Sequence, residues 1–255
     1  MSFLKGKKIL ILGMANKYSI GYGIAKAMYQ QGADLAFTYQ NLKYKKRVIK
    51  LANNFNSNII FPCDVSSDNN IINLFSNLSI IWKKFDGFVH AIAYTPISQL
   101  QNNYIDCITK KIFNMTHVIT SYSLVSMIKA CKNMLNKKSS IITISFIGAN
   151  IIIPYYNIMG LAKASLEANV RYSANILGKD NIRINGISPA PIKTLASFKI
   201  KNFNKLFNDS KKKNILKRNI TIHEIGNVAA FLCSDLSSGI TGQIIYVDGG
   251  YNLMY

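Results

Sequence analysis

The feature that most constrains this fold is a series of seven short, mostly apolar runs separated by stretches long enough for helices. The runs cover residues 9–12, 34–39, 58–62, 86–93, 141–146, 183–188 and 243–247. Runs of this kind are typical of strands buried on both faces, as in a parallel sheet. Their alternation with helix-length segments predicts an α/β fold: a doubly wound, Rossmann-like parallel sheet with helices on both faces. A chain of 255 residues suits a single domain spanning 1–255.

Candidate ligand-binding residues follow the ends of these runs. Open parallel sheets bind ligands beyond the carboxyl ends of their strands, because those ends meet at one edge. The residues at or just past six predicted strand ends are Gly13, Gln40, Asp64, Ile92, Phe146 and Ile192. Their convergence, rather than any single motif, predicts a dinucleotide site.

The first strand and the helix after it offer a phosphate-binding turn. Gly13 follows the strand, and Ser19 can cap the predicted helix 20–31. Free N–H groups at the start of that helix would attract a pyrophosphate. Gly13, Gly21 and Gly23 are too far apart for the usual G-x-G-x-x-G fingerprint, so this motif alone is weak evidence.

Two polar residues indicate how an adenosine would be held. Gln40 stands where a ribose-binding acid is usual; it can hydrogen-bond a ribose hydroxyl and has no charge to pair with a 2′-phosphate. Basic residues follow within 43–47, so charge alone does not decide between NADH and NADPH. Asp64 either accepts a hydrogen bond from the adenine amino group or caps a helix that begins near Ser66.

Tyr156 and Lys163 are the candidate catalytic pair. They lie seven residues apart in a predicted helix that follows Pro154 and also carries Glu167. At about 3.6 residues per turn, this spacing puts both side chains on one helix face. An ammonium group nearby would lower the pKa of the phenol and make it a better proton donor. Judged alone, such a pair is more often an ordinary surface pair, so its meaning depends on the surrounding site.

Composition narrows the classes of partner. The chain has 31 basic and 11 acidic residues, a net charge of +20, which marks an anionic partner or reflects lysines spread along a chain rich in Ile and Asn. No motif of interleaved basic and aromatic residues indicates nucleic acid. The four cysteines are too scattered for a metal or redox motif and predict reduced thiols in the cytoplasm. We expect no metal, no membrane span and no signal peptide.

With these residues assembled, the chain resembles the short-chain dehydrogenase/reductase superfamily and, within it, the bacterial NADH-dependent enoyl-[acyl-carrier-protein] reductases. The likeness covers nearly the whole chain. Its most specific segments are T-Y-Q-N at 38–41, K-F-D-G-F-V-H at 84–90 and Y-N-I-M-G-L-A-K-A-S-L-E-A-N-V-R-Y at 156–172. General members of the superfamily place the tyrosine four residues before the lysine, where this chain has Met159. The enoyl reductases place it seven residues before, as Tyr156 is.

The resemblance implies a function and a site. It implies that NADH reduces trans-2-enoyl thioesters on acyl carrier protein, the last step of type II fatty acid elongation, in a homotetramer. It implies that Tyr156 and Lys163 are catalytic and that Thr95 contacts the substrate through its backbone. The residues that it implies bind the cofactor are Gly13, Ser19, Ile20, Gln40, Asp64, Val65, Ile92, Lys163, Ile192, Lys193, Thr194, Leu195 and Ala196.

Two departures from the family pattern bear on activity. Phe146 stands where the family usually has a second active-site tyrosine. It keeps the ring and loses a hydroxyl whose hydrogen bond would contribute about 1–3 kcal/mol. Ala93 replaces a common glycine, and its methyl group would lie near the pocket.

The stretch 195–219 has no strand pattern and is rich in lysine, so we expect a mobile substrate-binding lid. Lys201 and Lys205 would meet the acidic carrier protein there. Two alternatives stay open. A 3-ketoacyl reductase would need a tyrosine at position 159 and a serine near Thr143. An inactive nucleotide-binding protein would fit Phe146 and the high positive charge.

Overall fold

The computed structural model describes residues 2–254, which form one seven-stranded sheet in the order β3-β2-β1-β4-β5-β6-β7. The strands are β1 (Lys8–Leu12), β2 (Asp34–Tyr39), β3 (Ile60–Pro62), β4 (Phe85–His90), β5 (Leu135–Ile144), β6 (Arg183–Pro189) and β7 (Ile244–Val247). Every strand pairing is parallel. The predicted α/β fold is therefore confirmed, and the order of the strands along the sheet reverses between β1 and β4.

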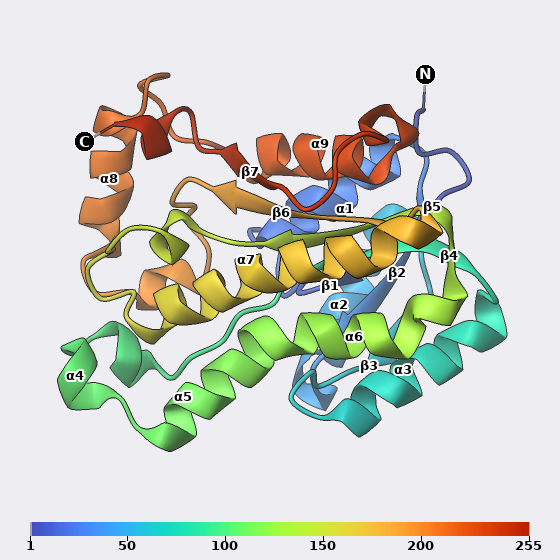
Figure 1. Cartoon of the computed structure of the whole chain (residues 1–255), viewed down its shortest axis with the longest axis horizontal. Coiled ribbons are helices and arrows are strands. Elements are labelled where there is room, and N and C mark those ends of the chain that lie inside the picture. Colours follow the sequence, from blue (N-terminus) through green and yellow to red (C-terminus); the bar gives the residue numbers. More distant parts are fainter. Residues whose placement is uncertain (1, 255) are drawn as a thin grey trace.

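Helices cover both faces of the sheet (Figure 1). One face carries α1 (Ile20–Gln30), α2 (Leu42–Ala52) and α9 (Ile222–Cys233), which share an apolar core with β1 and β2. The other face carries α3 (Asp68–Ile81), α6 (Ser123–Cys131) and α7 (Ile158–Leu177), which share a second core. The remaining helices, α4 (Tyr104–Cys107), α5 (Lys110–His117) and α8 (Phe203–Lys213), gather toward the carboxyl ends of the strands (Figure 1).

Several boundaries differ from the sequence-based expectation. The strand expected over 141–146 is β5, which begins earlier, at Leu135, and ends at Ile144. The strand expected over 86–93 ends at His90. The stretch 195–219 has no strand, as expected, but most of it is a 3-10 turn and the helix α8.

The start of α7 is the difference that matters most for the site. The expected helix contains Tyr156, yet α7 begins only at Ile158. Tyr155 and Asn157 on either side of Tyr156 have positive φ angles of 63° and 45°, which a right-handed helix does not allow. The idea that helical pitch aligns Tyr156 with Lys163 is therefore wrong: Tyr156 lies in the turn before the helix.

Two glycines let α1 and α9 touch backbone to backbone. A methyl group on Gly23 would lie 2.3 Å from the carbonyl oxygen of Ile222, and one on Gly226 would lie 2.4 Å from the carbonyl oxygen of Gly23. No side chain fits between the helices at this point. The position of α1, whose N-terminus faces the predicted phosphate turn, therefore depends on α9.

Replacing Gly226 with alanine should force α1 and α9 apart and lower the free energy of unfolding by about 1–3 kcal/mol. Gly178→Ala is the matched control, because Gly178 has a helical backbone (φ −58°, ψ −35°) and open space around it. There alanine should be neutral or slightly stabilising, since it favours helical backbone. Urea denaturation compares the two, and equal midpoints would contradict the close helix contact.

Candidate active site

The structure brings the predicted binding residues to one edge of the sheet. Because all strands are parallel, residues that follow their carboxyl ends meet there. The residues placed along this edge are Gly13, Gln40, Asp64, Ile92, Phe146 and Ile192, after β1 to β6 in turn. The site therefore lies across the point where the strand order reverses, between β1 and β4.

The turn after β1 fits a diphosphate. Gly13 has a φ of +90°, and a methyl group there would lie 2.0 Å from the carbonyl oxygen of Ala91, so only glycine fits. Ser19 precedes α1 but does not cap it with its side chain; its hydroxyl donates to the carbonyl of Asn16 at 2.6 Å. The backbone N–H groups of Ile20 and Gly21 have no backbone acceptor among the described residues. These free donors suit the anionic group of a dinucleotide.

Gln40 and Asp64 meet at the predicted adenosine end. The Gln40 amide donates to one Asp64 carboxylate oxygen at 3.3 Å. The other oxygen accepts from the backbone N–H and the hydroxyl of Ser66, at 3.0 and 2.7 Å. Although burial alone would raise the pKa of Asp64, these hydrogen bonds lower it. The N-cap of α3 is Ser67, so the carboxylate of Asp64 holds the preceding turn and remains an ionised acceptor.

Lys163 projects from α7 to the carboxyl end of β5. Its ammonium group donates to the carbonyl oxygen of Ile144 at 2.5 Å. Only 4% of the residue is exposed. Burial lowers the pKa of Lys163 to about 7, and the nearby carboxylate of Glu167 partly opposes that effect. Glu167 is itself buried and accepts a hydrogen bond from Ser145 at 2.5 Å.

Tyr156 is fixed by its turn and by contacts with the segment after β5. Its ring meets Phe146 edge to face, with 4.9 Å between centroids and 63° between planes. A methyl group on Gly148 would lie 2.6 Å from the Tyr156 ring, so the backbone there packs directly against it. Burial raises the pKa of Tyr156. The expectation that Lys163 lowers this pKa is therefore wrong in this arrangement, and the phenol stays protonated.

The sequence does not mark His90 as a site residue, yet it is fully buried and near enough to Lys163 to feel its charge. The two ring nitrogens of His90 lie 3.1 Å from the hydroxyl of Thr143 and 2.8 Å from that of Ser123. Both hydroxyls also donate to backbone carbonyls, Ser123 to that of Ile119 at 2.7 Å and Thr143 to that of His90 at 3.2 Å, so these partners suit a proton on either ring nitrogen. Burial, with a smaller effect of Lys163, lowers the pKa of His90 to about 3. No local pattern marks this neutral histidine, because its partners come from distant segments.

The segment after β6 is held by a serine that the sequence does not single out. The Ser197 hydroxyl donates to the carbonyl of Ile192 at 2.7 Å and accepts from the backbone N–H of Thr194 at 2.9 Å. This closes the loop around Ile192 and Thr194, which are among the predicted cofactor-binding residues. Its other members are exposed: Lys193, whose ammonium lies 4.6 Å from the centroid of the Phe207 ring, Leu195 and Ala196.

Three further predicted positions are buried or partly buried. Thr95 is buried, and its hydroxyl accepts a hydrogen bond from the Thr116 hydroxyl at 3.0 Å. Val65 is buried next to Asp64, at the predicted adenosine end, and Ile92 is partly buried.

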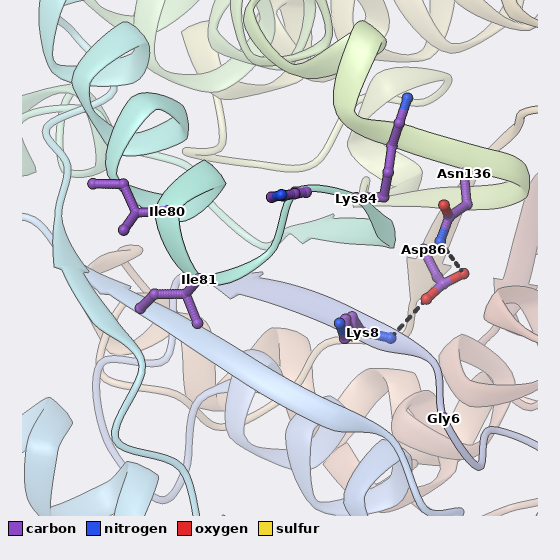
Figure 2. Close-up of a pocket in the computed structure, with 8 residues that line it drawn as sticks. Gly6, Lys8, Ile80, Ile81, Lys84, Asp86 and Asn136 are labelled. Atoms are coloured by element: carbon purple, nitrogen blue, oxygen red, sulfur yellow. Dashed lines mark hydrogen bonds between the residues drawn. The ribbon is translucent and has the colours of Figure 1, made fainter.

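A cavity of about 540 Å³ lies at the opposite edge of the sheet, among the starts of β1, β4 and β5 (Figure 2). Its only carboxylate, Asp86, already accepts from the backbone N–H of Lys8 at 2.8 Å and from the Asn136 amide at 3.0 Å (Figure 2). A second cavity, of about 420 Å³, is lined by Tyr156 and the start of α7. The candidate catalytic group thus faces the smaller cavity.

Residues 2–254 contain no group of three or more side chains suited to hold a metal ion. None of the helices in that range is both long and apolar enough to cross a bilayer.

Residues 13–252 match the family model described as Enoyl-(Acyl carrier protein) reductase. The chain belongs to this family. It is 54% identical over 253 residues, 99% of this chain and 97% of the relative, to an enoyl-[acyl-carrier-protein] reductase [NADH] FabI of Buchnera aphidicola subsp. Acyrthosiphon pisum. The solved enoyl-[acyl-carrier-protein] reductase (NADH) of Aquifex aeolicus VF5 is 42% identical, with a TM-score of 0.96 over 99% of this chain and 98% of that one.

A further solved structure is similar over nearly the same length. The enoyl-(acyl-carrier-protein) reductase of Anaplasma phagocytophilum, in complex with NAD, is 37% identical, with a TM-score of 0.94 over 99% of this chain and 94% of that one. The resemblance drawn from the sequence is therefore confirmed at the level of family and fold for this reductase.

Replacing Lys163 with methionine should remove a pH-dependent contribution to the free energy of unfolding. The substitution ends the cost of burying a cation but leaves the buried carboxylate of Glu167 without its nearby positive charge, so the pH dependence is the informative quantity. The pKa of Lys163 falls from 10.5 to about 7 on folding. Between these values the unfolded wild-type chain binds more protons, so the free energy of unfolding of the wild type should rise with pH relative to that of Lys163→Met.

Urea denaturation at several pH values from 7 to 9.5 measures this difference. Lys179→Met, at an exposed lysine, controls for loss of one positive charge. A wild-type free energy of unfolding that falls with pH relative to Lys163→Met would show that Lys163 is not a buried cation whose charge opposes folding.

Proposed function

We propose that this reductase uses NADH to reduce the C2–C3 double bond of trans-2-enoyl thioesters on acyl carrier protein, the last step of fatty acid elongation. The observation that carries the proposal is that Tyr156 and Lys163 both lie at the carboxyl end of β5, one against the ring of Phe146 and the other on the carbonyl of Ile144. This end of β5 belongs to the sheet edge that also carries the turn at Gly13. Relatives named for the same activity with NADH, and a similar structure that contains NAD, support it.

Bound NADH would supply a hydride to C3 of the substrate. Negative charge then develops on the thioester oxygen, and a donor placed there contributes much of the catalysis. Tyr156 is that donor in our proposal. Because burial raises its pKa, its hydroxyl keeps the proton until the oxygen becomes basic enough to take it. Lys163 would bind the ribose hydroxyls. Its pKa of about 7 leaves it only partly charged at neutral pH. Hydrogen bonds from its ammonium group to the ribose would raise that pKa and favour the charged form.

Phe146 leaves Tyr156 as the one proton donor of this proposal. Its ring packs against Tyr156 as a tyrosine ring would, but it offers no proton. Met159, at the position where other superfamily members have their tyrosine, is buried and apolar. A 3-ketoacyl reductase is therefore the weaker alternative, because the group that its chemistry needs is missing.

The stretch 195–219 would serve as the lid over the acyl chain. Ile200 and Phe203 from this stretch share an apolar cluster with Tyr156 and Met159. An acyl chain entering beside Tyr156 would therefore meet apolar side chains from both sides. Lys201 and Lys205 are exposed on the outer side, where they could attract an acidic carrier protein.

We also propose a homotetramer that works in the cytoplasm. Leu161, Tyr172 and Ile176 form an exposed apolar stripe on α7, with 41%, 78% and 62% of their surfaces exposed. A second copy would bury such a stripe. The four cysteines are free thiols and three of them are buried, which suits a reducing compartment.

Tyr156→Phe should lower turnover at least tenfold with little change in NADH affinity, because it removes the donor and keeps the ring. Tyr155→Phe is the matched control, since it removes a hydroxyl from the neighbouring residue of the same turn. Absorbance at 340 nm follows NADH oxidation with a 2-enoyl thioester and, separately, with a 3-ketoacyl thioester. Unchanged turnover in Tyr156→Phe would remove Tyr156 from its role, and preference for the ketoacyl substrate would overturn the function.

Tyr172→Glu combined with Ile176→Glu should dissociate the tetramer into smaller species, because two carboxylates cannot be buried without partners. Ile80→Glu, at an 81% exposed isoleucine of α3, should leave the assembly intact. Light scattering coupled to size exclusion gives the mass. A monomeric wild-type protein would contradict the proposed assembly.

A further inference from the structure

Residues 97–102 connect two parts of the molecule that the proposed function treats separately. We name this stretch the clamp segment. On one side it touches the turn that carries Tyr156, and on the other it touches the start of the lid. Its Leu100 side chain belongs to the same apolar cluster as Tyr156, Ile200 and Phe203.

Asn157 makes the contact with the turn. Its side-chain amide donates to the backbone carbonyls of Gln99 at 2.7 Å and Asn102 at 2.9 Å. Both amide protons are therefore used on the clamp segment. Asn157 occupies the N-cap position of α7, yet its side chain makes no capping bond, and its backbone has φ 45° and ψ −125°. Such a conformation is costly for a residue other than glycine and persists only where surrounding contacts hold it.

The lid makes three contacts with the other parts of this junction. The backbone N–H of Lys201 donates to the carbonyl of Leu100 at 2.8 Å. The Gln101 amide donates to the carbonyl of Lys199 at 2.5 Å. The ammonium group of Lys201 also lies 4.8 Å from the centroid of the Tyr155 ring, in the same turn as Tyr156.

The clamp segment is also held by α4, which makes it rigid. A movement of the lid would therefore reach the turn that carries Tyr156 and would not be lost in the segment between them. Gln99 is buried, and its amide donates to the carbonyl of Cys107 at 2.6 Å. The segment is thus fixed to α4 at Gln99, the residue whose carbonyl also accepts from Asn157.

We propose that Asn157 is a positioning residue that ties the lid, through the clamp segment, to the turn carrying Tyr156. Closing the lid over the acyl chain and aiming the Tyr156 hydroxyl at the thioester are then one event. The inference rests on the proposed role of Tyr156 and adds the residue that links it to the lid. An ordinary capping role does not account for Asn157, because both of its amide protons leave the helix for the clamp segment.

Asn157→Gly removes both hydrogen bonds and suits the positive φ angle, so the variant should fold. We expect kcat to fall about tenfold and KM for the enoyl thioester to rise, with the Kd for NADH unchanged. Asn181→Gly is the matched control: Asn181 also has a positive φ angle, of 56°, is exposed, and should tolerate glycine without loss of activity. Asn157→Asp, which keeps the shape and loses the donors, should repeat the defect. Wild-type kinetics in both Asn157 variants would overturn the proposal.

Two further measurements separate coupling from simple loss of stability. Gln101→Ala breaks the lid side of the clamp segment, so the double variant Asn157→Gly/Gln101→Ala should be about as impaired as the worse single variant. Trypsin should cut after Lys199, Lys201 or Lys205 several times faster in Asn157→Gly than in the wild type or in Asn181→Gly. Fully additive effects, or equal cleavage rates, would overturn the coupling.

The failure of this inference is distinguishable from failure of the proposed function. Cleavage of the lid needs no turnover, so it reports the link between Asn157 and the lid whether or not Tyr156 is the donor. Conversely, Tyr156→Phe tests the donor without touching the clamp segment. Normal turnover in Tyr156→Phe with fast cleavage in Asn157→Gly would keep the link and reject the donor.

Discussion

The site depends on burying one ammonium group at the end of the central strand. Lys163 donates to the Ile144 carbonyl and lies close enough to the buried carboxylate of Glu167 to be partly stabilised by it. Removing a cation from water is costly, and a single carbonyl does not compensate it. The same charge disfavours a second cation nearby, which is one reason His90 stays neutral within its hydroxyl partners. The charge of Lys163 thus affects both the Ile144 carbonyl at the end of the central strand and the protonation of His90. A bound cofactor would give this ammonium group further hydrogen-bond acceptors.

Tyr156 is placed by different means. It has no helix to hold it, since α7 starts two residues later, and its orientation comes from strained neighbours and close packing. Positive φ angles at Tyr155 and Asn157 turn the chain, while the ring fits against Phe146 and the backbone at Gly148. Such an arrangement stores strain that must be balanced elsewhere. The hydrogen bonds from Asn157 to the clamp segment stabilise the strained turn. Because the lid binds the same segment, the lid and the Tyr156 turn are connected through it.

The sequence predicts the strands and the binding edge well, because both follow from local patterns. Apolar runs mark buried strands, and a parallel sheet then brings Gly13, Gln40 and Asp64 to one edge without knowledge of the packing. The start of α7 is not predictable in this way. A spacing of seven residues suits a helix, and the turn at Tyr156 is set by contacts with residues about 55 positions away. The neutral His90 likewise depends on partners that the fold brings from distant segments, Thr143 and Ser123.

Phe146 removes a hydroxyl group that the family usually has beside Tyr156, and this makes the position of the Tyr156 hydroxyl more critical. A second hydroxyl beside Tyr156 could have shared the developing charge and tolerated small errors in the position of the first. In the proposed mechanism, an apolar ring there leaves only the geometry of the Tyr156 turn to decide whether a donor reaches the thioester oxygen. Hydrogen-bond strength falls steeply with misalignment, so a site with one donor needs a more rigid turn than a site with two. The paired hydrogen bonds from Asn157 and the edge-to-face contact with Phe146 provide that rigidity.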